Sequence, residues 1–279
     1  MRRLFCCIKL DMVEGFRSVW PCLAAAILLQ MLNTVLLDSS LRAMSCEESI
    51  SLADCIVYAL GGIKEPVQDE MSRLAFPVAW VLFFMLLAYA SLTYPRRDLD
   101  GFGRSVVVAS GGRWVWWTSK CLWVCACSLF VALASVFGAC MAVVVLGGGL
   151  FGPVHVEAVQ VLPLDFGALR QTPWDAAPFF FSAMAIVLAF PLAQLALSFL
   201  LKPVFAYAAC VASLFVSVFV STPLLPGEYC MVARSGVFVE AGCDPCAGLL
   251  YAAGLAVLSF LCGGLLFAKS DIVGKEIGE

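Results

Sequence analysis

Long apolar runs that are almost free of charged residues are the feature that most constrains this chain. A helix needs about 20 apolar residues to cross the hydrocarbon core of a bilayer, and six stretches of the sequence come close to or exceed that length. The predicted spans cover residues 19–38, 75–94, 121–146, 177–200, 204–222 and 247–268. Hydrophobic residues make up 62% of the 279 residues and charged residues 13%, against about half and about a quarter in a soluble domain. The sequence therefore predicts an all-α, polytopic membrane protein with a single transmembrane domain, residues 1–279.

Basic residues in the segments between the spans predict how the chain is oriented. Twelve of the 17 Lys and Arg residues fall on the same side as the N-terminus, and five fall on the other side. Because Lys and Arg are enriched in cytoplasmic loops, both termini are predicted to be cytoplasmic, in a protein of the cell membrane. No stretch is basic enough to follow a phosphate backbone, so the bilayer is an expected partner and nucleic acid is not.

The N-terminal segment before the first span has a helical pattern of its own. Residues 3–18 carry Phe5, Ile8, Met12 and Phe16 at spacings of three and four. This periodicity predicts an amphipathic helix that lies in the membrane interface. The alternative is that the segment is the start of a long first span.

Few residues of the sequence could support catalysis. The single histidine, His155, lies in a predicted external loop and is expected to be solvated. A zinc site of the H-E-x-x-H kind needs two histidines on one helix face, and the sequence contains no Gly-x-Ser-x-Gly turn. Residues 263–270 resemble a phosphate-binding loop, but Ala268 stands where the second glycine is required. The sequence predicts no enzyme activity, metal site or cofactor in this chain.

Five of the 14 cysteines lie in segments that could meet an oxidising compartment. They are Cys46, Cys55, Cys230, Cys243 and Cys246. These residues could form two disulfides and leave one thiol, or form none. The others lie in apolar runs or near the N-terminus, and a cysteine in an apolar run behaves as a small hydrophobic residue.

The polar residues inside the predicted spans are neutral. Gln30 and Asn33 lie in the first span and Gln194 in the fourth. Such residues commonly form hydrogen bonds between membrane helices, and the alternative is that these three line a translocation path. Ion-driven transporters usually carry a charged residue inside the membrane, so the sequence does not favour ion coupling.

The predicted cytoplasmic segment between the second and third spans, residues 96–120, is basic and rich in glycine. Residues 102–109 are expected to form a short amphipathic helix that docks a cytoplasmic partner. The alternative is that the segment is an ordinary basic cytoplasmic loop. Trp116 and Trp117 are expected at the headgroup level, as in an aromatic belt. The basic residues of the segment and one of its glycines occur in the order Arg96, Arg97, Gly101, Arg104, Arg113 and Lys120.

This pattern resembles the coupling loop of ABC-transporter permeases of the type-2 exporter class. The order of Arg96, Arg97, Gly101, Arg113 and Lys120 is similar to the family pattern, as are the six spans, the interfacial helix and the cytoplasmic termini. Two positions depart from it, because Arg104 replaces an acidic residue and residues 110–112 replace a turn proline.

The resemblance implies that the segment contacts a separate ATP-binding subunit, and that a second permease copy or a paralogue completes a dimer. It also implies that residues 223–246 form a re-entrant segment before the last span. The expected function is the membrane-spanning subunit of an ATP-driven exporter with an unidentified cargo. The alternative is a membrane interaction or assembly protein without a transport path.

Overall fold

The computed structural model describes residues 2–44, 49–64, 76–92, 94–95, 112–162 and 169–269. Within these ranges the chain is helical, with isolated β-bridges and no β-strand, which confirms the predicted all-α class. Four of the described helices are long and apolar enough to cross a membrane. They are α1 (Arg2–Ala43), α6 (Arg113–Val145), α8 (Ala177–Leu197) and α11 (Pro245–Lys269).

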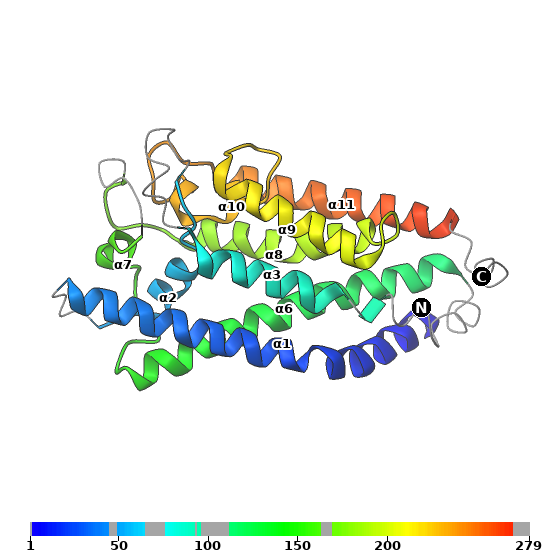
Figure 1. Cartoon of the computed structure of the whole chain (residues 1–279), viewed down its shortest axis with the longest axis horizontal. Helices are drawn as coiled ribbons and strands as arrows, with labels where there is room; N and C mark the ends of the chain where they lie inside the picture. Colours follow the sequence, from blue (N-terminus) through cyan, green and yellow to red (C-terminus); the bar gives the residue numbers. More distant parts are fainter. Residues whose placement is uncertain are drawn as a thin grey trace.

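Two further apolar helices are shorter than a usual span. Helix α3 (Val78–Leu92) has 15 residues and α9 (Pro203–Phe219) has 17. At 1.5 Å per residue they are about 23 and 26 Å long, which is less than the hydrocarbon thickness of about 30 Å. Helix α3 falls inside a predicted span, α9 begins one residue before one, and both run beside the four long helices (Figure 1). Helix length alone therefore identifies four spans, and the count of six stays a prediction.

The helices form an elongated bundle with two different ends (Figure 1). Helix α1 begins and α11 ends at the same end of the bundle, which we call the terminal end. The short helices gather toward the opposite end, which we call the capped end. These are α2 (Leu52–Ala59), α7 (Val156–Gln160), α10 (Gly227–Cys230) and the 3₁₀ helix η3 (Val232–Arg234).

Helix α1 is continuous over 42 residues. No break separates the predicted interfacial helix from the predicted first span, so the alternative of one long helix matches the structure. At 1.5 Å per residue the helix is about 63 Å long, roughly twice the hydrocarbon thickness. Its buried residues recur with a helical period and face the bundle, where α6 is the main neighbour. They include Cys7, Asp11, Gly15, Val19, Cys22 and Ala26.

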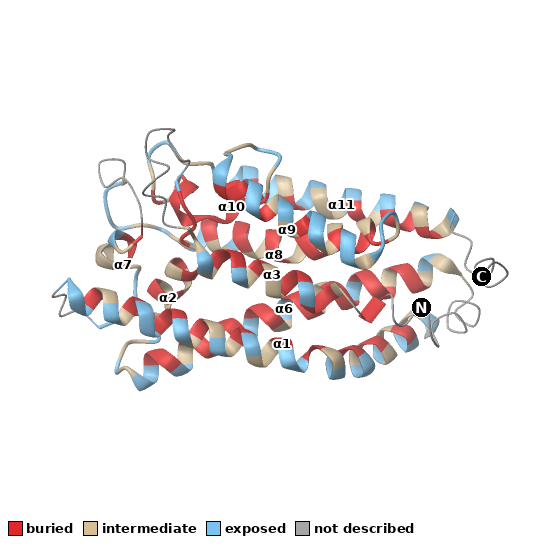
Figure 2. Ribbon diagram, in the orientation of Figure 1, coloured by how far each residue is buried: buried red, intermediate tan, exposed pale blue. Residues whose placement is uncertain are grey.

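The large apolar residues in the first half of α1 point away from the bundle. Phe5, Phe16 and Trp20 are 69%, 45% and 62% exposed. Small side chains instead form the inner face, and at Gly15 a β-carbon would collide with the indole ring of Trp123. A surface of this kind suits contact with lipid on the outside and close helix packing on the inside. Figure 2 shows the same division of buried and exposed faces along α1.

Helix α6 begins at Arg113, eight residues before the predicted start of the third span. Trp116 and Trp117 are each 1% exposed, so they pack inside the bundle, and their expected position at the headgroup level stays a prediction. The Trp116 ring stacks on Phe267, with 4.6 Å between ring centroids, and Trp117 packs edge-on against Phe199 at 5.5 Å. Aromatic packing of this kind joins α6 to α11 and to the end of α8.

The predicted external loop 223–246 folds into the capped end as α10, η3 and several turns. Cys230, Met231 and Phe238 in this segment are 0% exposed. The indole Nε1 of Trp80 donates a hydrogen bond of 3.2 Å to the carbonyl oxygen of Cys230. The loop is therefore part of the core, and its correspondence to a re-entrant segment stays a prediction.

The described candidates for disulfide bonds are reduced. Cys55, Cys230, Cys243 and Cys246 are free thiols. Cys46 lies outside the described residues.

Candidate functional site

A buried ion pair joins α1 to α6 at the terminal end. The Lys120 ammonium lies 2.5 Å from Oδ1 of Asp11, and the two side chains are 1% and 3% exposed. Asp11 lies on the inner face of α1, and Lys120 lies on the second turn of α6. Two charges at this depth are stable only when each is paired and hydrogen-bonded.

Hydroxyl groups and aromatic rings complete the surroundings of this ion pair. Ser119 Oγ donates to Oδ2 of Asp11 at 2.5 Å, and the Tyr94 hydroxyl donates to Oδ1 at 3.0 Å. The Lys120 ammonium lies 4.7 Å from the ring centroid of Tyr94 and 5.1 Å from that of Trp116. We call these five residues the terminal cluster. It connects α1, the segment that follows α3, and α6.

The resemblance implies that Lys120 contacts a partner subunit. In the structure, however, the Lys120 side chain lies inside the bundle, next to Asp11. Because its side chain is 1% exposed, it is not at the surface in this structure. From the sequence, Lys120 is expected at the end of a loop, and Asp11 is not among the predicted site residues. The four-residue spacing of Cys7, Asp11, Gly15 and Val19 in the sequence could have identified Asp11, because it is the charged member of an otherwise small and apolar face.

Arg113 holds the end of α11. Its Nη1 donates to the carbonyl oxygen of Ala268 at 2.5 Å and to that of Phe267 at 3.4 Å. The last carbonyl groups of a helix have no partner within the helix and carry partial negative charge, so a guanidinium group stabilises them. Arg113 therefore links the first turn of α6 to the last turn of α11.

The rest of the predicted coupling segment lies outside the described residues. This applies to Arg96, Arg97, Gly101 and Arg104, and to the helix expected over residues 102–109. Their role as contacts for an ATPase stays a prediction.

Two of the three candidate path residues donate hydrogen bonds that join helices. Gln30 Nε2 donates to the carbonyl oxygen of Cys55 at 3.1 Å, which ties α1 to α2. Gln194 Nε2 donates to the carbonyl oxygen of Ala88 at 2.9 Å, which ties α8 to α3. Asn33 is 5% exposed and lines a pocket between α1 and α3 that does not include Gln30. The hydrogen bonds of Gln30 and Gln194 agree with the alternative that they join helices.

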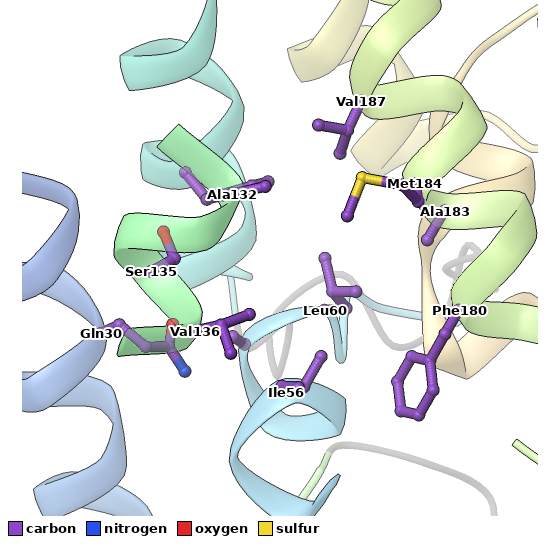
Figure 3. Close-up of a pocket in the computed structure, with 12 residues that line it drawn as sticks. Gln30, Ile56, Leu60, Ala132, Ser135, Val136, Phe180, Ala183, Met184 and Val187 are labelled. Atoms are coloured by element: carbon purple, nitrogen blue, oxygen red, sulfur yellow. The ribbon is translucent and has the colours of Figure 1, made fainter. Parts of the chain in front are cut away.

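Gln30 lines a different pocket, of about 270 Å³, inside the bundle (Figure 3). Side chains from α1, α2, α3, α6 and α8 line it, and most of them are apolar. Val136 of α6 and Met184 of α8 point toward one another across the space (Figure 3). The pocket has no charged residue among its lining residues.

His155 forms part of a second polar cluster, at the capped end. Its Nδ1 lies 2.6 Å from Oδ2 of Asp54, and its backbone N–H donates to Oδ1 at 2.8 Å. Asp54 is 1% exposed and also forms a capping box with Ser51 at the start of α2. The His155 side chain is 27% exposed, so it is partly solvated, as expected, and in addition contacts Asp54. A capping box typically begins a helix, so the pattern Ser51-x-x-Asp54 could have identified the start of α2.

A third polar cluster fixes the segment around η3. Arg234 Nη1 lies 3.3 Å from Oε2 of Glu228, and its Nε donates to the carbonyl oxygen of Ile63 at 3.0 Å. Cys243 Sγ donates to Oε1 of Glu228 at 3.2 Å. Burial and the neighbouring Glu228 carboxylate raise the pKa of Cys243 to about 11, so its thiol stays protonated at neutral pH. The Cys243 thiol therefore lacks the acidic character that redox-active cysteines need.

Comparison with known proteins adds no further identification. No family model, curated protein or solved structure matches the chain. The four long apolar helices are compatible with a multi-pass α-helical membrane protein, and this is the class that the fold supports. Among the described residues no group of three or more His, Cys, Asp and Glu could hold a metal ion.

Proposed function

We propose that the chain is the membrane-spanning permease subunit of an ATP-driven exporter, and that a separate cytoplasmic subunit hydrolyses the ATP. In this proposal α1, α3, α6, α8, α9 and α11 all cross the cell membrane, and both termini are cytoplasmic. A second permease copy or a paralogue completes the transporter. The sequence pattern of residues 96–120 supports the proposal, together with the shared position of the start of α1 and the end of α11 at the terminal end (Figure 1).

The observation that carries the proposal is the way in which the end of this segment is attached to the bundle. Lys120 is joined to α1 through Asp11, and Arg113 is joined to the last carbonyl groups of α11. A force on residues 96–111 would therefore act on α1 and α11 as well as on α6. Rigid attachment of this kind is what a permease needs in order to convert movement of a partner into movement of its helices.

The experiment is co-purification of the tagged chain from membranes of cells that express its neighbouring genes. An ATPase subunit is expected to purify with it and to give vanadate-sensitive ATP hydrolysis. Replacing Arg97 and Arg104 with Glu should remove that subunit while the amount of the chain in the membrane stays the same. Arg113 is unsuitable for this test because it holds the end of α11. Lys202→Glu, at an exposed position before α9, is the matched charge reversal and should retain the subunit.

A non-transporting membrane interaction protein is the second candidate. The observation that favours it is that Gln30 and Gln194 donate hydrogen bonds that join helices, which is the role such residues have without a transport path. Purification of the chain without an ATPase, from cells that contain every neighbouring gene product, would overturn the exporter proposal and favour this candidate.

A further inference from the structure

The pocket in Figure 3, which lies beside α2, contains a buried hydroxyl group without a partner among the described residues. Ser135 lines this pocket and is 8% exposed, and its Oγ has no hydrogen-bond partner among the described residues. A serine within a membrane helix usually donates to the carbonyl group four residues earlier. Ser128, two turns earlier on α6, does so, with a hydrogen bond of 2.8 Å to Val124. Leaving a buried hydroxyl without a partner costs about 1–3 kcal/mol.

The lining of the pocket is suited to an apolar molecule. Phe83, Phe180, Met184 and Val187 surround the space, and no charged residue reaches it. Methionine and aromatic side chains adapt to ligands of different shape. The volume of about 270 Å³ exceeds that of an engineered cavity that binds benzene, about 150 Å³, and approaches the lower range for small-molecule sites.

Ordered water is a poor occupant for this space. A buried water needs two to four polar partners, and Ser135 and Gln30 are the polar side chains that line the pocket, so a water held between them would leave most of the apolar volume unfilled. The amide nitrogen of Gln30 already donates to Cys55. A ligand that fills the apolar volume and offers one oxygen to Ser135 satisfies both features of the pocket.

We propose that this pocket binds an uncharged amphipathic molecule, with its alkyl or aromatic body between α6 and α8 and one oxygen accepting a hydrogen bond from Ser135. The oxygen can belong to an alcohol, an ether or an ester. A bilayer lipid and a free small molecule share this chemistry, and the experiment below distinguishes them. Binding by the chain alone requires no ATPase, so this proposal and the export proposal can fail separately.

The test uses the full chain, purified and reconstituted in lipid nanodiscs, and an eight-carbon alcohol that carries a photoreactive diazirine. Labelled residues are located by mass spectrometry, and unlabelled octanol is the competitor. Labelling is expected on α6 and α8 around the pocket, and it should saturate and be competed. In Ala183→Trp, whose added ring occupies the pocket, the saturable labelling should disappear. Ala132→Leu is a smaller change with the same purpose, should the tryptophan variant fail to fold.

Ser135→Ala tests the hydrogen bond. A net contribution of about 0.5–1.5 kcal/mol corresponds to an apparent affinity that is roughly two- to tenfold weaker. Ser128→Ala is the matched control on the same helix, and it should leave the affinity unchanged because Ser128 lies outside the pocket. Each variant is checked for a monodisperse elution profile.

Lipid extraction from the purified chain separates the two sources. If a bilayer lipid occupies the pocket, a retained lipid is expected in the wild type and not in Ala183→Trp, and the probe should label only after delipidation. If a free small molecule is the ligand, the probe should label the wild type directly in nanodiscs. The proposal is overturned if labelling is not saturable before or after delipidation. It is also overturned if Ser135→Ala and a pocket-filling variant both leave saturable labelling unchanged.

Discussion

Removing one member of the buried Asp11–Lys120 pair is expected to destabilise the bundle, whereas removing both is expected to cost little. At the 2.5 Å separation and an effective dielectric constant of about 20, the Coulomb attraction is about 7 kcal/mol. Desolvation of the two ions costs several kcal/mol for each, so the net contribution of the pair is small. A single substitution, Asp11→Asn or Lys120→Met, leaves a buried charge without its partner, which costs about 3–5 kcal/mol.

A double-mutant cycle measures this directly. The free energy of unfolding is obtained by titrating the purified chain with SDS in mixed micelles and following tryptophan fluorescence, which the buried Trp116, Trp117 and Trp123 should make sensitive to unfolding. The double variant Asp11→Asn/Lys120→Met should be much more stable than the two single variants predict. The expected coupling energy is about 3 kcal/mol or more.

An exposed pair on the same helix is the control. Glu14 and Arg17 lie 3.6 Å apart, with side chains 55% and 76% exposed. Surface pairs of this kind contribute about 0–1 kcal/mol, so the Glu14→Gln/Arg17→Met cycle should give a coupling energy close to zero. A similarly small coupling energy for Asp11 and Lys120 would show that the two charges are not paired, and the reasoning about the terminal cluster would then be wrong.

Three further predictions concern other parts of the fold. Gly138→Ala should destabilise the chain by about 1–3 kcal/mol, since its β-carbon would lie 2.5 Å from a carbonyl oxygen of α1. The control is Gly254→Ala, whose β-carbon would lie in open space and which should be neutral or slightly stabilising in the same SDS titration. Asp54→Asn removes the charged acceptor of the capping box, so it should cost about 2 kcal/mol and speed amide exchange in α2; unchanged exchange would argue against that role. At pH 8 maleimide should modify the exposed Cys246 well before Cys243, whose pKa of about 11 keeps it protonated. Cys243 should become reactive only as the pH approaches that value. Equal modification rates at pH 8 would contradict the hydrogen bond from Cys243 to Glu228.

The apolar helices were predictable because their signal is local. Residues 177–200 and 247–268 were predicted as spans, and α8 and α11 occupy nearly the same positions. Proline helps to set such boundaries, since Pro203 at the start of α9 has a backbone conformation suited to the first helical turn. Helix α6 begins eight residues before the predicted third span, which starts directly after the charged residue Lys120. Lys120 does not end the helix because its charge is paired with Asp11 of α1.

The polar clusters could not be found in the same way because their members are distant in sequence. Asp11 and Lys120 are 109 residues apart, and Asp54 and His155 are 101 apart. Each of these residues alone has the appearance of an ordinary charge or polar group at the edge of a span. Only the packing of α1 and α2 against other segments brings the partners together, and local periodicity does not describe that packing.

Both ends of the bundle are held by buried polar contacts, while the pocket beside α2 is apolar. At the terminal end, Lys120 and Arg113 attach α6 to α1 and α11. At the capped end, Asp54 and Arg234 attach α2 and η3 to neighbouring segments. Breaking either set of contacts would leave buried charges without partners, whereas apolar contacts around the pocket can rearrange at lower cost. Movement within this fold is therefore expected to change the shape of the pocket lined by Gln30 and Ser135 first. A molecule bound there would respond to a force applied at the terminal end.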